Sequence, residues 1–158
     1  MKQVNYNEVA DVYDQRYRTG GPTGIAECLQ ALVFKTRANR VLEAGCGTGQ
    51  WLTLLHGCGF RCGLDYSARM LEKARQRDAA LALGRGTATQ LPFAAAAFDF
   101  VFCVHALHHF DDPQAFIVEA YRVIRKPSRT GGTCMSTFLG LTRRIWRDTL
   151  QAIRFYTG

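Results

Sequence analysis

Residues 41–49 read Val-Leu-Glu-Ala-Gly-Cys-Gly-Thr-Gly, and this stretch decides the fold. A short apolar strand runs into three alternating glycines, Gly45, Gly47 and Gly49, and the pattern predicts a helix after them. Glycine lets the backbone turn sharply and brings its amides close to a ligand where a Cβ would collide. The stretch therefore predicts a cofactor-binding turn between a strand and a helix.

A carboxylate follows this turn at a sequence spacing that is typical of nucleotide-binding sites. The next predicted strand ends in Asp65, about 20 residues after Gly45, which is the offset at which a carboxylate meets ribose hydroxyls. The dinucleotide fingerprint leaves two residues before its third glycine, whereas Gly47 and Gly49 are separated by one, so a pyrophosphate ligand is disfavoured. With Glu43 just upstream, the stretch resembles motif I of the class I S-adenosylmethionine-dependent methyltransferases.

Predicted strands and helices alternate along the rest of the chain. Strands are expected at 40–44, 60–65, 82–86, 98–104 and 132–138, and helices at 23–38, 49–57, 67–78 and 113–125. Ser67 and Asp112 are the expected N-caps of the last two helices. The alternation predicts an α/β, Rossmann-like, doubly wound and mostly parallel sheet of strand order 3-2-1-4-5. The cofactor is expected at the carboxyl ends of the strands, where the order reverses.

Size and composition predict one globular domain. The chain has 158 residues, 47% of them hydrophobic and 21% charged. We expect residues 1–22 to form an arm that folds back as a lid and residues 23–158 to form a single domain. No run approaches the roughly 18 apolar residues of a membrane span, and the N-terminus lacks a signal-peptide core. These features predict a cytoplasmic protein.

The cysteines and the net charge indicate no special chemistry. Six cysteines are mostly placed in predicted helices and strands, where a reduced, buried thiol fits. Cys58 and Cys62 lack a second matching pair, so no metal site is expected. The basic residues behind the net charge of +7 are spread over several segments, and only the C-terminal stretch concentrates them. Such a spread is typical of a solvated surface.

The resemblance implies a set of cofactor contacts. The glycine loop would hold the methionine end of the cofactor, Asp65 the ribose hydroxyls, and Tyr66 the adenine, while aromatic residues of the arm would pack over it. The residues implied in this way are Tyr13, Arg16, Tyr17, Glu43, Gly45, Cys46, Gly47, Gly49, Asp65, Tyr66, Thr87, Ala88 and Val104. Family members usually carry an acid at the Thr87 position, so adenine recognition should be weaker or differently arranged here.

A histidine-rich segment provides the candidate catalytic residue. The stretch 98–110 resembles motif IV and the turn behind it, which places His105 nearest the methionine moiety. A histidine there could orient a substrate or act as a general base, because its ordinary pKa lies near neutrality. For His108 and His109, a role in the turn is favoured over catalysis.

The C-terminal part departs from the family pattern. Relatives carry a final antiparallel strand pair, which is missing here, so the edge of the fifth strand would be exposed. We expect that edge to be covered by the terminal helix, 141–156, or by a second copy of the chain in a homodimer. The terminal helix is basic and amphipathic, and could bind an acidic partner or a membrane surface if it does not pack on the sheet.

These features predict an S-adenosyl-L-methionine-dependent methyltransferase that acts on a small-molecule acceptor by direct transfer and releases S-adenosyl-L-homocysteine. One alternative is a truncated or non-catalytic module that binds the cofactor without a complete acceptor site. A less favoured one is an RNA methyltransferase, because the chain carries no clear nucleic-acid motif and no separate RNA-binding domain.

Overall fold

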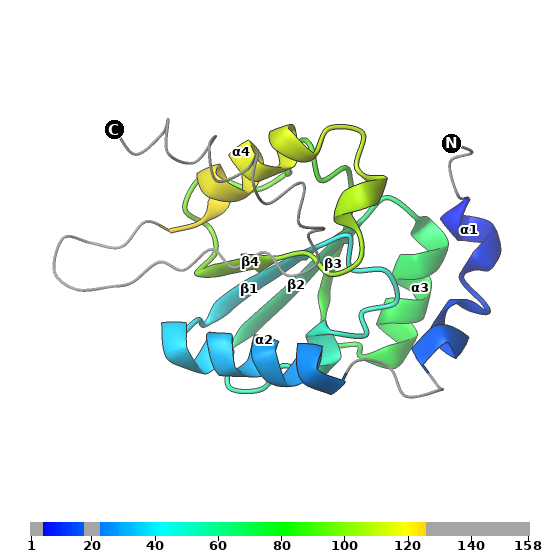
Figure 1. Ribbon diagram of the computed structural model, residues 1–158, viewed down its shortest axis with the longest axis horizontal. Helices are drawn as coiled ribbons and strands as arrows, with labels where there is room; N and C mark the ends of the chain where they lie inside the picture. Colours follow the sequence, from blue (N-terminus) through cyan, green and yellow to red (C-terminus); the bar gives the residue numbers. More distant parts are fainter. Residues whose placement is uncertain (1–4, 18–22, 126–158) are drawn as a thin grey trace, which may run out of the picture.

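The described part of the chain is built around a parallel sheet. The computed structural model describes residues 5–17 and 23–125. Within them, the strands are β1 (Arg40–Ala44), β2 (Phe60–Asp65), β3 (Ala82–Arg85) and β4 (Phe100–Phe102), in the order β3-β2-β1-β4 (Figure 1). All three pairings are parallel, so the predicted fold class and the order 3-2-1-4 are confirmed. The predicted fifth strand and the terminal helix lie outside the described residues.

The register of the sheet places the carboxyl ends of neighbouring strands at one level. Glu43 of β1 lies opposite Gly63 of β2 on one side and Phe102 of β4 on the other. Because β2 and β4 flank β1, the chain reverses its direction of winding at β1. A crevice at this switch point is where ligands bind in open α/β sheets.

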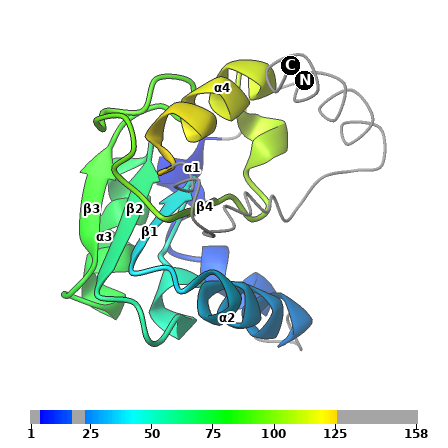
Figure 2. The same ribbon diagram turned by 90° about the vertical axis from the view of Figure 1, so that its left-hand side faces the viewer.

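Helices cover both faces of the sheet. They are α2 (Thr23–Thr36), α3 (Ala68–Arg77) and α4 (Pro113–Val123), with a short α1 (Tyr6–Val9) in the N-terminal arm. Figure 2 shows the sheet between α2 on one side and α4 on the other. The predicted caps are confirmed, since the Ser67 side chain accepts from the Met70 amide and the Asp112 side chain accepts from the amides of Gln114 and Ala115.

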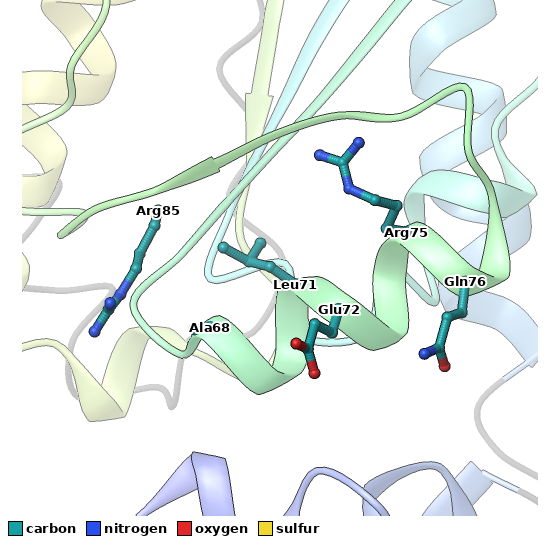
Figure 3. Close-up of a pocket in the computed structure, with 6 residues that line it drawn as sticks. All are labelled: Ala68, Leu71, Glu72, Arg75, Gln76 and Arg85. Atoms are coloured by element: carbon teal, nitrogen blue, oxygen red, sulfur yellow. The ribbon is translucent and has the colours of Figure 1, made fainter.

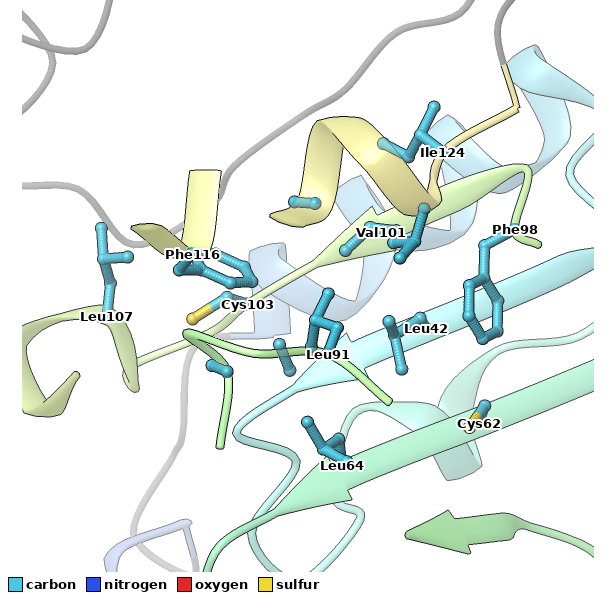
Figure 4. Packing of buried hydrophobic residues seen from close by; sticks show 14 residues of the cluster. Leu42, Cys62, Leu64, Leu91, Phe98, Val101, Cys103, Leu107, Phe116 and Ile124 are labelled. Carbon is cyan, nitrogen blue, oxygen red and sulfur yellow. The ribbon is translucent and has the colours of Figure 1, made fainter. Parts of the chain in front are cut away.

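The core lies on both faces because successive strand residues point in opposite directions. Leu42 and Val101 pack with Phe116 of α4 on one face (Figure 4). Val41 and Phe100 pack with helix α2 on the other. Full burial of one such side chain contributes about 1.5–3 kcal/mol, so this double layer holds the strand ends in place.

The helix predicted at 49–57 is wrong over most of its length. A turn follows Gly49, and the only helical piece described there is a 3-10 helix, Leu52–Leu54. Leu55 is already extended, and Gln30 of α2 binds both the amide and the carbonyl of His56, at 2.8 and 2.9 Å. Because Gln30 satisfies those backbone groups, this segment has no need of further helical hydrogen bonds.

Five other elements are shorter than predicted, although α3 and β3 lose no more than one residue at either end. The helix predicted to reach residue 38 ends at Thr36, because Arg37 adopts a φ of +52°, the left-handed conformation that closes helices. The strand predicted at 98–104 covers only Phe100–Phe102. The helix predicted to reach residue 125 ends at Val123, and the next residue, Ile124, forms an isolated bridge with Phe98. No described helix is long and apolar enough to cross a membrane.

Candidate cofactor-binding site

The three glycines of the loop all have backbone conformations that other residues avoid. The φ angles of Gly45, Gly47 and Gly49 are +71°, +52° and +73°. A Cβ on Gly45 would lie 2.4 Å from the Cβ of Ala106, and one on Gly49 would lie 3.2 Å from the Cβ of Ala74 in α3. Glycine is therefore needed here both for the turn and for close approach of the neighbouring segments.

Gly47 differs from the other two glycines. A Cβ built on it would meet only Tyr13 of the arm, at 3.7 Å from Cε1. Its amide donates to Asp65 Oδ2 at 2.8 Å. The loop thus presents one glycine that faces the arm, held in place by the carboxylate that the sequence assigned to the cofactor.

Asp65 joins the glycine loop to the start of α3. Its Oδ2 accepts from Gly47 and its Oδ1 accepts from the Ser67 amide, also at 2.8 Å. Burial raises the pKa of the Asp65 carboxyl, while the amides of Ser67, Gly47 and Tyr66 offset part of that shift. Each carboxylate oxygen keeps a further lone pair, so the group can also accept hydrogen bonds from ligand hydroxyls.

Glu43 is a buried carboxyl beneath the same loop. It is fully buried, and among the described residues neither of its oxygens has a hydrogen-bond partner of good geometry. Burial raises its pKa well above the ordinary value, the negative charge of Asp65 adds to the shift, and the Leu52 amide offsets a part. A buried acid that lacks a full partner is rare, and here it lies at the end of the central strand.

The buried neighbours of the loop point into the protein. Cys46 Sγ lies 2.7 Å from where a Cβ on Gly63 would be, so the thiol faces β2. Burial, with Glu43 as the next cause, raises the pKa of the Cys46 thiol well above its ordinary value. Val104 is also buried, in the cluster beneath α2. These two residues can reach a ligand only through their backbone.

Tyr66 and Thr87 lie at the end of β2 and after β3. Tyr66 is 73% exposed, and Arg85 donates to its carbonyl at 3.0 Å with the guanidinium 5.7 Å from the ring centroid. The Thr87 hydroxyl lies 2.9 Å from the Thr89 hydroxyl, and Ala88 is buried in the core. Sequence reasoning missed Arg85, because only the pairing of β2 with β3 places it opposite Asp65.

The histidine segment forms a turn against the glycine loop. His105 is exposed, has a φ of +55°, and its ring lies 6.5 Å from that of the buried Trp51. The contact between Gly45 and Ala106 brings this turn to the loop. His109 Nε2 lies 2.5 Å from the hydroxyl of Tyr6 in the arm. That contact spans 103 residues of sequence, so no local pattern could have predicted it.

The arm reaches the site through more residues than the resemblance implied. Asp14 accepts from the Thr48 hydroxyl at 2.6 Å and forms an ion pair with Arg77 of α3. Arg16 and Tyr17 belong to the 3-10 helix Tyr13–Tyr17, but their side chains lie outside what the structure describes. Asp14 and Arg77 were missed because their roles depend on two segments that only the fold brings together.

An open groove lies between α3 and β3 and shares Arg85 with the end of the site at Tyr66 (Figure 3). It is lined by Ala68, Leu71, Glu72, Arg75, Gln76 and Arg85. None of these residues is among the predicted cofactor contacts. In the part of the chain that the structure describes, no group of three histidine, cysteine or acidic residues is arranged to hold a metal ion.

Comparison with known proteins identifies the family. The sequence profile of a methyltransferase domain matches residues 42–130, which include the glycine loop, Asp65 and the histidine segment. The chain belongs to the class I S-adenosylmethionine-dependent methyltransferases. The resemblance stated from motif I is thereby confirmed.

Among curated relatives of this methyltransferase domain is a malonyl-[acyl-carrier protein] O-methyltransferase from Enterobacter lignolyticus. It is 34% identical over 131 residues, which cover 77% of this chain and 49% of the relative. A demethylmenaquinone methyltransferase from Lactiplantibacillus plantarum is 35% identical, over 61% of this chain and 44% of that protein. The chain thus spans about half the length of the curated relatives it matches.

Solved structures give the same result. An S-adenosylmethionine-dependent methyltransferase from Thermotoga maritima has a TM-score of 0.63 and 28% identity, over 77% of this chain and 56% of that one. An amino pentose methyltransferase from Micromonospora echinaspora, solved with S-adenosylmethionine bound, has a TM-score of 0.65 and 28% identity, over 77% and 53%. The likeness covers the sheet and the loop that form the candidate site.

Proposed function

We propose that this methyltransferase domain binds S-adenosyl-L-methionine at the carboxyl ends of β1, β2 and β4 and transfers its methyl group directly to a small-molecule acceptor. The observation that carries the proposal is the glycine loop, whose Gly47 amide is hydrogen-bonded to Asp65 at 2.8 Å. When bound, the cofactor supplies an activated methyl carbon, so the protein need only position the reactants and exclude water.

The residues present fit this cofactor. Asp65 retains lone pairs that can accept from ribose hydroxyls, and Tyr66 offers an exposed ring beside the same strand end. Among the described residues, Tyr13 of the arm is the side chain that a Cβ on Gly47 would meet. Glu43 supplies a buried carboxyl below the loop with hydrogen-bonding capacity to spare. Arg85, which lies over Tyr66, takes part in the adenine end of the site.

His105 is the proposed residue for orienting or deprotonating the acceptor. It is exposed on the turn that packs against Gly45, and an imidazole can accept a proton near neutral pH. In direct transfer, the acceptor atom forms its bond to the methyl carbon while the carbon–sulfur bond breaks. A proton on the acceptor would then pass to the imidazole.

The proposed acceptor class is a small molecule or a small group on a carrier. Relatives named for malonyl-[acyl-carrier protein], demethylmenaquinone and a 2-methyl-6-phytyl-1,4-hydroquinone support this class. They differ from one another in the acceptor, so the proposal extends to the class and not to one compound. The homodimer and the cytoplasmic location remain predictions from the sequence.

Calorimetric titration with S-adenosylmethionine and S-adenosylhomocysteine tests the proposal. The intact chain should bind both, and Asp65→Ala should lose binding because the ribose acceptor and the brace on Gly47 disappear together. Asp99→Ala is the matched control, since Asp99 also accepts from two backbone amides, those of Asn39 and Arg40, but at the opposite end of β1. It should lower stability and leave binding intact.

The outcomes separate the competing readings. Absence of binding by the folded intact chain contradicts the proposed function. Binding without turnover on quinol, hydroxyl and carboxyl acceptors would instead favour the non-catalytic module. Transfer to RNA that persists in high salt would favour the RNA methyltransferase, because non-specific attraction to phosphate weakens steeply with salt.

A further inference from the structure

The N-terminal arm is fastened directly to the glycine loop. Asp14 Oδ1 accepts from the Thr48 hydroxyl at 2.6 Å, while Oδ2 pairs with Arg77. Arg77 in turn donates to the Thr48 carbonyl at 3.0 Å and to Gln50 Oε1 at 2.8 Å. One carboxylate therefore ties the arm, the loop and helix α3 into a single hydrogen-bonded network.

This network decides where the neighbouring ring lies. Tyr13 directly precedes Asp14, and its Cε1 is 3.7 Å from where a Cβ on Gly47 would be. A Cβ at that position would be in ordinary van der Waals contact with the ring, so the ring lies directly over the glycine and no ligand atom fits between the two. A ligand can enter across Gly47 only when Tyr13 moves, and Tyr13 moves with the arm.

We propose that Asp14 is a positioning residue of the cofactor site, which holds the arm over Gly47 through Thr48 and Arg77 and so governs how fast the cofactor leaves. The inference rests on the proposed function for the identity of the ligand. It goes beyond that function by assigning control of cofactor exchange to Asp14, a carboxylate that is not among the predicted cofactor contacts.

Asp11 and Asn7 of the arm instead contact α3 and its N-cap. Asp11, which has a 60% exposed side chain, pairs with Lys73 and Arg69 on α3. Asn7 accepts from the Ser67 hydroxyl at 2.8 Å. Asp14 instead engages Thr48, which is 1% exposed and lies between two glycines of the loop. Asp11 therefore provides a matched control on the same arm.

The test measures release of tritiated S-adenosylhomocysteine from the full chain during a chase with unlabelled ligand. Asp14→Asn removes the charge that pairs with Arg77, and a charge-assisted hydrogen bond accounts for about one to two powers of ten in an equilibrium. We expect release to accelerate about tenfold in Asp14→Asn. In Asp11→Asn it should change less than about twofold, because exposed ion pairs contribute little.

Two further variants separate positioning from general stability. Asp14→Glu keeps the charge and should restore slow release at least in part. Thermal unfolding of the ligand-free Asp14→Asn and Asp11→Asn chains should be alike, since Asp14 loses one ion pair and Asp11 loses two, and partly exposed ion pairs contribute little to stability. Equal release rates in Asp14→Asn and Asp11→Asn would overturn the proposal. Faster release from Asp14→Asn together with a proportionate loss of thermal stability would also overturn it.

Failure of the proposed function can be distinguished from failure of this inference. If the intact chain binds neither S-adenosylmethionine nor S-adenosylhomocysteine, the proposed function falls. Hydrogen exchange of amides 5–17 in the ligand-free chain still tests the anchor. Faster exchange in Asp14→Asn than in Asp11→Asn supports the anchoring role of Asp14, and equal exchange refutes it.

Discussion

At the scale of single residues, the candidate site contains groups that a folded core normally excludes. Glu43 is buried without a complete hydrogen bond, and Asp65 bears its charge nearby. Both positions were identified from the sequence, Glu43 within motif I and Asp65 at the end of the next predicted strand. Their electrostatic coupling was not, because it depends on the pairing of β1 with β2.

The raised pKa of Glu43 makes a prediction about pH. The folded chain holds this proton more tightly than the unfolded chain does, so its contribution to stability falls as the pH rises above the ordinary value of 4.5. Glu43→Gln, which carries no charge at any pH, should therefore stabilise the protein at pH 7 by about 1–3 kcal/mol. At pH 4 the substitution should have little effect.

Urea unfolding at several pH values between 4 and 8 checks this. The difference between the variant and the unsubstituted chain reports the ionisation of Glu43 together with its coupling to Asp65. A difference in the free energy of unfolding that stays constant over this range would show that Glu43 carries the same charge in the folded and unfolded chains.

At the scale of elements, local signals were reliable where caps and periodicity agreed. Both predicted N-caps hold their helices, and β1 and β2 begin and end at the predicted residues. The helix predicted at 49–57 failed, and at its far end Gln30, from a different element, occupies the backbone groups of His56. A competing partner from elsewhere in the chain cannot be read from a local pattern.

The cap of α4 can be measured directly. Asp112 accepts from the amides of Gln114 and Ala115 at 2.9 and 3.0 Å. Asp112→Ala should lower the free energy of unfolding by about 1 kcal/mol, as loss of such a cap does elsewhere. The neighbouring Asp111→Ala removes an exposed carboxylate outside the cap and should change stability by less than about 0.5 kcal/mol. Equal losses in the two variants would show that the cap contributes nothing.

At the scale of the whole molecule, the site is made by two turns that meet at the switch point of the sheet. Gly45 follows β1 and Ala106 follows β4, and a Cβ on the glycine would lie only 2.4 Å from that of the alanine. Gly45→Ala should lower the free energy of unfolding by about 2–4 kcal/mol, because it adds both a left-handed alanine and an overpacked contact.

Gly24→Ala is the control for that experiment. Gly24 lies in the first turn of α2, and a Cβ there would meet no atom of the described residues within 4 Å. Alanine should be neutral or stabilise the helix by up to about 1 kcal/mol. Urea unfolding of both variants gives the comparison. If Gly45→Ala has the same free energy of unfolding as the unsubstituted chain, the two turns can move apart without loss of stability, which contradicts the prediction.

The sequence by itself determined the parallel α/β fold, the strand order as far as β4, the glycine turn and its partner Asp65. Periodicity, caps and glycine spacing are local properties, and parallel strands joined by helices admit few arrangements. Only the tertiary structure decided that Asp14 binds Thr48 and Arg77, that Tyr6 meets His109, and that Arg85 lies over Tyr66. Such contacts join segments that are distant in the chain, and they form only because burial of the two core faces brings those segments together.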